Sequence, residues 1–95
     1  MKAYKHLVKH VLAQGHVISV WDGEEWQVNH STGYQNIIEA IESVEEAQIK
    51  IRVPSYGNLV AWALISAYGL ADDETVIDYS DNKFMQEWSL QYDKV

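Results

Sequence analysis

The chain has 95 residues, 47% of them hydrophobic, and carries 14 acidic residues against 7 Lys and Arg, a net charge of −7. This length supports one hydrophobic core, so we expect a single acidic domain over residues 1–95. The acidic excess argues against direct binding to nucleic-acid phosphates, which needs clustered cations. The chain has no Cys, which excludes disulfides and thiolate metal sites.

Charge is segregated along the chain. Residues 1–16 are basic, residues 17–46 carry seven acids and no Lys or Arg, and residues 72–95 carry seven acids against two Lys. No apolar run approaches the roughly 20 residues that span a bilayer, and the N-terminus lacks a signal peptide's apolar segment. We therefore expect a cytoplasmic protein with a mostly negative surface, one basic helix and no membrane contact.

Residues 3–14 have the periodicity of an amphipathic helix. Its apolar stripe consists of Tyr4, Leu7, Val8, Val11 and Leu12. The basic residues, His6 and His10 among them, lie off this stripe and are expected to face water. Gly15 is well placed to end the helix in a left-handed conformation.

Residues 17–28 read as a β-hairpin hinged on Asp22-Gly23. A two-residue loop would pair Trp21 with Glu24. A three-residue loop would pair Val20 with Glu24 and Ile18 with Trp26, placing Ile18, Val20, Trp26 and Val28 on one face. Because a one-residue slip exchanges the faces, the hydrophobic pattern favours the three-residue loop. Trp26 is then predicted in the core, and Trp21 at the turn, partly exposed.

A second helix is expected after Thr32, which with Gln35 matches a capping box. Its apolar stripe is Tyr34, Ile37, Ile38, Ile41 and Val44. Four glutamates, Glu39, Glu42, Glu45 and Glu46, cover its outer side and its end. Acids near a helix C-terminus oppose the macrodipole.

Residues 47–53 alternate apolar and polar, which predicts a half-buried strand, and residues 54–58 form a turn. The stretch Leu59–Tyr68 is ambiguous: Val60, Trp62 and Leu64 alternate with small residues, yet the alanines also permit a helix. Its position after a strand and a turn favours a strand, whose alanine face would let a helix pack closely.

Residues 69–74 are predicted to form an acidic loop, and residues 75–79 a short fifth strand. A last helix, capped by Ser80 or Asp81, has an inner side formed by Phe84, Met85, Trp88 and Tyr92. The predicted fold class is α+β, with helices packed on a small antiparallel sheet of four to five strands, in the order α-β-β-α-β-β-(β)-α.

No catalytic constellation stands out. His6 and His10 could share a metal ion, but a zinc site would need further ligands, from His16, His30 or a glutamate, and the simpler interpretation is two solvated histidines. Glu24/Glu25, Glu45/Glu46 and residues 72–74 pair carboxylates only in turns and at a helix end, whereas a glycosidase-type pair needs an apolar pocket. We expect neither an enzyme nor a cofactor.

The acidic surface and the many aromatics point to protein binding, although an acidic surface also serves solubility alone. Acids would steer a basic partner and an exposed aromatic would anchor it. The residues assigned to this surface are Trp21, Asp22, Glu24, Glu25, Glu39, Glu42, Glu46, Asp72, Asp73 and Glu74. A narrower form of the hypothesis is DNA mimicry, in which the carboxylates imitate a phosphate track.

Four stretches are similar to small uncharacterised acidic accessory proteins of tailed bacteriophages. They are Val20–Trp26, Ile37–Ala47, Trp62–Leu64 and Tyr68–Leu70. The resemblance implies a phage protein, acting in the host cytoplasm, that binds and disables a host enzyme or defence complex. It carries over no catalytic residue.

Two classes of alternative stay open. One is a small hydrolase-like or metal-binding enzyme that uses clustered carboxylates or histidines. The other is a self-assembling structural component, for example a homodimer. Trp21 itself has two interpretations, as a contact point for a partner or as a side chain folded back over a neighbouring element.

Overall fold

The computed structural model describes residues 1–55, 57–68 and 71–94. The elements are α1 (Ala3–Ala13), β1 (Val17–Trp21), β2 (Trp26–Ser31), α2 (Tyr34–Glu42), β3 (Ala47–Arg52), β4 (Leu59–Ile65), the 3-10 helix η1 (Asp72–Glu74), β5 (Val76–Tyr79) and α3 (Lys83–Asp93). The predicted α+β class and element order are confirmed. Tyr56 of the predicted turn, and Gly69 and Leu70 of the predicted acidic loop, lie outside the described residues.

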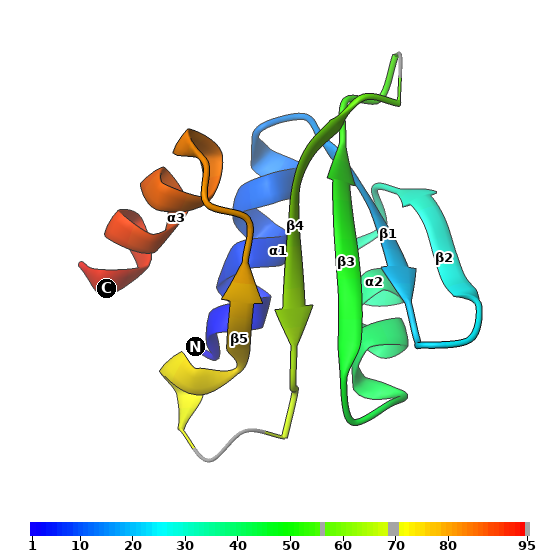
Figure 1. Cartoon of the computed structure of the whole chain (residues 1–95), viewed down its shortest axis with the longest axis horizontal. Coiled ribbons are helices and arrows are strands. Elements are labelled where there is room, and N and C mark those ends of the chain that lie inside the picture. Colours follow the sequence, from blue (N-terminus) through cyan, green and yellow to red (C-terminus); the bar gives the residue numbers. More distant parts are fainter. Residues whose placement is uncertain (56, 69–70, 95) are drawn as a thin grey trace.

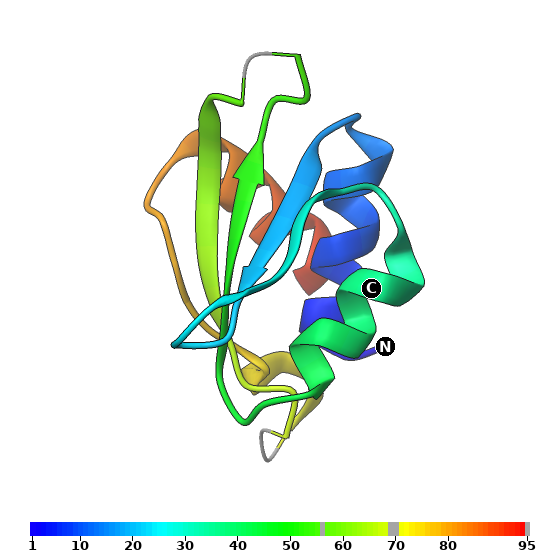
Figure 2. The same ribbon diagram turned by 90° about the vertical axis from the view of Figure 1, so that its right-hand side faces the viewer.

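The five strands form one antiparallel sheet in the order β2-β1-β3-β4-β5. All three α-helices lie on one side of it (Figures 1 and 2). The other side has no helix over it in the described part of the chain, and we call it the open face. The side chains of the open face include Trp21, Trp26, Glu46, Gln48, Lys50, Arg52, Trp62, Leu64 and Asp78, together with Val17 and Ser19, which are covered.

Strand alternation decides which side chains face the helices. On β3, Ile49 and Ile51 are buried while their neighbours are only partly covered. On β4, Ala61 and Ala63 are buried in the core, so the ambiguous stretch is a strand over Leu59–Ile65 with its alanines toward the helices. Small side chains there leave room for the helix layer to approach the sheet closely.

The helical stripes predicted from periodicity are confirmed. Every residue of the three stripes is either buried in the core or packed against it. Gly15 has φ +82°, and the N–H groups of Gly15 and His16 donate to carbonyls in the last turn of α1, a Schellman-type end.

The predicted hairpin register is wrong. Trp21 pairs with Trp26, and the four residues 22–25 form the loop, in which the Asp22 N–H donates to the Glu25 carbonyl at 3.1 Å. Trp26 is therefore not in the core: its side chain lies on the open face and is 41% exposed. Gly23 takes a positive φ of 103°, which explains the glycine at that position.

Two irregularities in β2 account for the error. Trp21 pairs with Trp26, but Val20 pairs with Val28 and Ile18 with Ser31, so β2 holds two more residues than β1 over this length. At the second irregularity His30 has φ 49°. The buried Ser19 hydroxyl stabilises it, because it accepts the His30 N–H at 2.9 Å and donates to Asn29 at 2.7 Å.

Both predicted N-caps are also wrong. α2 begins after Gly33 without a side-chain cap, and the Ser31 hydroxyl instead accepts the Gly33 N–H at 3.0 Å. α3 is capped by Asn82, whose side-chain oxygen accepts the Met85 N–H at 3.1 Å. Asn82 fits this position because its amide also donates to the Val60 carbonyl at 2.7 Å, which ties the helix start to β4.

The expectation that the histidines of α1 face water is wrong as well. α3 packs along this side of α1, and the Trp88 Nε1–H donates to His6 Nδ1 at 3.1 Å. The His10 ring lies 5.4 Å from the Phe84 ring, and the His6 ring lies 5.2 Å from the Tyr92 ring. Aromatic side chains of α3 therefore half-bury both histidines.

Candidate functional site

Three acidic segments that are distant in sequence meet at one end of the molecule. They are the β1–β2 loop, the end of α2 with the turn into β3, and η1, all at the lower end of Figure 1. Each contributes three acids, so nine of the 14 lie here, and none of the three segments carries Lys or Arg. We call this surface the acidic end: Asp22, Glu24, Glu25, Glu42, Glu45, Glu46, Asp72, Asp73 and Glu74.

Strand pairing brings the three segments together. Trp21, the last residue of β1, pairs with Gln48 near the start of β3. Ala47 pairs with Ile65, the last residue of β4, and Ile65 pairs with Val76 at the start of β5. The β1–β2 loop, the turn from α2 into β3 and η1 all adjoin these paired residues. Their acids therefore lie at the same end of the sheet.

The β1–β2 loop is held by its own aspartate. One carboxylate oxygen of Asp22 accepts the N–H groups of Glu24 and Glu25, both at 2.8 Å, and the other accepts from the Gln27 amide at 2.5 Å. These donors, first the Glu25 N–H, lower the pKa of Asp22 below its ordinary value. The loop therefore presents Glu24 and Glu25 from a locally ordered backbone.

Trp21 borders the acidic end on the open face. Its ring packs edge-on against the Trp26 ring, with centroids 5.1 Å apart, and is partly covered. It also lines an open hollow of about 370 Å³ together with Gly23, Glu46, Gln48 and Leu64. Trp21 therefore contacts the neighbouring strand β2 and keeps part of its surface exposed.

The α2 segment is tied to α1. The Tyr4 hydroxyl donates to the Glu42 carboxylate, and Lys5 lies 3.9 Å from the same oxygen. Burial, and then the carboxylate of Glu42, raise the pKa of Tyr4. Glu39, predicted as part of the surface, lies one turn earlier on α2, where it lines a shallow hollow with Gln27, Asn36 and Ser43.

The third segment, η1, is fixed by buried Thr75. Its hydroxyl accepts the Tyr4 N–H at 3.1 Å and donates to the Asp72 carbonyl at 3.0 Å, which links η1 to the start of α1. The bond also satisfies one of the free N–H groups in the first turn of α1. Asp72, Asp73 and Glu74 are exposed.

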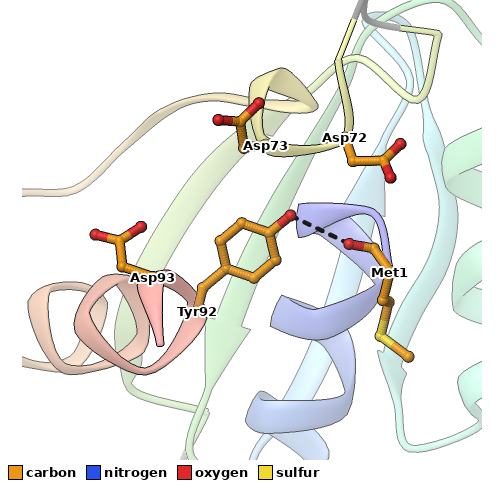
Figure 3. A pocket seen from close by; sticks show the side chains of 5 residues that line it. All are labelled: Met1, Asp72, Asp73, Tyr92 and Asp93. Atoms are coloured by element: carbon orange, nitrogen blue, oxygen red, sulfur yellow. Dashed lines mark hydrogen bonds between the residues drawn. The ribbon is translucent and has the colours of Figure 1, made fainter. Parts of the chain in front are cut away.

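A hollow of about 350 Å³ opens beside η1. Figure 3 shows Asp72, Asp73 and Asp93 around Tyr92, whose hydroxyl donates to the Met1 carbonyl at 3.1 Å. Burial, followed by these three aspartates, raises the pKa of Tyr92. The three carboxylates are exposed, so the hollow lacks the apolar surroundings that a general acid requires.

Three of the four histidines lie beside α3: His6 packs against Tyr92, and the rings of His10 and His16 each lie 5.4 Å from the Phe84 ring. His30 lies apart from them on β2, at the edge of the sheet. Within residues 1–55, 57–68 and 71–94, no group of three His, Asp or Glu side chains could hold a metal ion. No helix in the same residues has the length and apolar composition to cross a membrane.

Lowering the pH from about 7 to about 5 should decrease the free energy of unfolding. Burial beneath α3, and then neighbouring His6, lower the pKa of His10 below 6.5, while Gln91 and Glu87 oppose this shift. The unfolded chain therefore takes up a proton at His10 that the folded protein resists, so stability is full above about pH 6.5 and falls below it. Urea denaturation over this pH range measures the loss.

His10→Gln should reduce this loss, and His30→Gln, at an exposed position on β2, should leave it unchanged. Equal pH dependence in the two variants would contradict the assignment to His10.

The open face was not predicted from the sequence as a possible binding surface. Trp21, Trp26, Trp62 and Leu64 lie on it, and none of them belongs to the core cluster or packs against it. The sequence of β4 could have indicated this surface, because the side chains on both faces of that strand are apolar. When helices cover one face, the other apolar face is left bare.

No family model matches the chain, and neither a curated protein nor a solved structure matches it. The likeness to phage accessory proteins therefore stays a prediction.

Proposed function

We propose that this chain is a non-enzymatic protein-binding domain whose acidic end engages a basic surface on a partner protein. The gathering of nine carboxylates from three separate segments, with no Lys or Arg in any of them, is the observation that carries the proposal. Although Lys5 lies beside Glu42, the carboxylates outnumber the cations at this end, and such a negative field steers a positively charged partner and orients it on encounter. Trp26, which is 41% exposed, borders this field and supplies apolar contact area.

The proposed setting is the host cytoplasm, where a phage accessory factor binds and inhibits or redirects a host protein or defence complex. The sequence resemblance supports this setting, and the acidic end supplies the chemistry. A narrower version is DNA mimicry, in which the partner is a nucleic-acid-binding protein and the carboxylates occupy its phosphate site.

The test is capture from host lysate with two variants that each remove three negative charges. In the first, Asp72→Asn, Asp73→Asn and Glu74→Gln neutralise η1 at the acidic end. In the second, Glu39→Gln, Asp81→Asn and Glu87→Gln neutralise exposed acids elsewhere. The first set should weaken capture of a saturable partner about tenfold, and the second should leave it near the wild-type level.

Recovery of no saturable partner would contradict the proposal, and so would equal capture by both variants. Duplex DNA added to the captured complex then tests mimicry. DNA should displace the partner, and salt should weaken the complex; if partner binding responds to neither, the mimicry version is wrong while the protein-binding proposal stands.

A further inference from the structure

The open face is more apolar than a solvent-exposed sheet surface. Antiparallel sheets with one bare face ordinarily place polar side chains there. Here three of the five strands place Trp or Leu on it: Trp21 from β1, Trp26 from β2, and Trp62 and Leu64 from β4. None of these side chains packs against the core, and Trp26 is 41% exposed. Such a patch is typical of an interaction surface.

The charged side chains that β3 places on this face are ordered along the strand, and Asp78 of β5 adds one further acid. The side chains of β3 on the open face, together with the residue before the strand, read Glu46, Gln48, Lys50 and Arg52. The strand is therefore acidic where it starts and basic where it ends. Arg52 donates to the Gly57 carbonyl at 3.2 Å, and in the described part of the chain neither Lys50 nor Arg52 forms an ion pair.

This order is complementary to itself when reversed. Consider a second copy stacked face to face on the first, with its β3 strand running in the opposite direction. The twofold axis then lies between the two sheets, across the strands, and passes between Gln48 and Lys50. It places Glu46 over Arg52 of the partner subunit, and Arg52 over Glu46 of the partner subunit. Gln48 and Lys50 face each other in the same way. Stacking with parallel strands would instead place like charges over each other. The charges thus select one of the two symmetric arrangements.

We propose that a second copy of this chain covers the open face in this antiparallel arrangement. The two sheets would form a sandwich about 10 Å thick, filled by Trp21, Trp62 and Leu64 of both copies. The pairing leaves Asp72, Asp73 and Glu74 at opposite ends of the dimer, so they stay accessible to another protein. The dimer goes beyond the proposed function and does not depend on it.

The area of the open face determines how tightly we expect the dimer to associate. Five strands spaced about 4.8 Å apart and about 20 Å long cover roughly 500 Å² on each copy, or about 1,000 Å² in total. This is close to the lower limit for a specific interface. We therefore expect a reversible dimer that dissociates at about micromolar concentration.

Sedimentation equilibrium of the full chain over a concentration series tests the proposal. The wild type should show a monomer–dimer equilibrium. Glu46→Arg alone and Arg52→Glu alone should each weaken dimerisation about tenfold, because each places like charges together twice in the symmetric dimer. An equimolar mixture of the two variants should dimerise again, because both contacts in the heterodimer then pair opposite charges.

Glu87→Arg and Lys83→Glu provide matched controls. These residues pair with each other on the outer side of α3, with their closest charged atoms 3.9 Å apart, and the same charge reversals there should leave dimerisation unchanged. Circular dichroism checks that every variant is folded. A wild type that is monomeric throughout, single reversals without effect, or a mixture that stays monomeric would each overturn the proposal. The η1 variants should still dimerise, which separates this test from that of partner binding.

Discussion

Replacing Trp88 with alanine lowers the free energy of unfolding by about 3–5 kcal/mol, the cost of removing a large aromatic side chain from a packed core. Trp88 is only 3% exposed although it lies on the last helix. Its ring stacks on Tyr92 and meets Tyr79 edge-on, with centroids 5.8 and 6.0 Å away. Urea denaturation followed by circular dichroism measures the change.

Trp26→Ala is the matched control for this substitution. It removes the same side chain from the open face, where the main loss is the contact with Trp21, so we expect a cost of about 0.5–1.5 kcal/mol. Trp88→Phe should fall between the two, because it keeps most of the packing but leaves His6 Nδ1 without its donor. Equal costs for Trp88→Ala and Trp26→Ala would contradict the assignment of the two faces.

Replacing both Ala61 and Ala63 with leucine should also destabilise the protein strongly. Both alanines are buried beneath the helix layer, with exposed fractions of 1% and 0%. Added side-chain volume in such a packed layer costs about 1–3 kcal/mol at each position, because the helices have to move away from the sheet. Since each kcal/mol shifts the melting temperature of a domain this size by about 4–8 °C, thermal unfolding shows the effect clearly.

The control is the same change at two exposed alanines, Ala13 at the end of α1 and Ala71 before η1. Leucine there adds the same volume without displacing a neighbour, so we expect a change within about 0.5 kcal/mol. If the buried double variant melted like this control, β4 would not present its alanines to the helices.

Much of the fold follows from local periodicity. The core residues of α1, α2 and β3 were predicted correctly, because each of these elements is apolar on one face and buries only that face. The alanines of β4 also predicted that a helix packs closely on this strand. These features depend on the chain's own repeat and need no knowledge of distant contacts.

The hairpin register could not be obtained in this way. The pattern assumed an unbroken pairing, whereas β2 contains two extra residues that shift Val28 toward the helices and Trp26 away from them. The second shift depends on the buried hydroxyl of Ser19 and on the positive φ of His30. Neither feature has a recognisable sequence signal, since serine and histidine are ordinary strand residues at low frequency.

The acidic residues of the candidate surface could be listed from the sequence, but their clustering at one end of the molecule could not be predicted. The acids at 22–25, 42–46 and 72–74 were visible in the sequence, yet only the sheet order shows that they share one end. The half-burial of His6 and His10 likewise required knowing that α3 returns along α1.

Carboxyl footprinting of the protein bound to its captured partner tests whether the acidic end is the binding surface. Carbodiimide-activated amidation, read by mass spectrometry, reports the accessibility of each acid in the free and bound states. We expect severalfold protection of Asp72, Asp73 and Glu74 on binding, and unchanged labelling of Glu39, Asp81 and Glu87. Unchanged labelling of η1, or protection confined to Glu39, Asp81 and Glu87, would contradict the assignment of the acidic end as the binding surface.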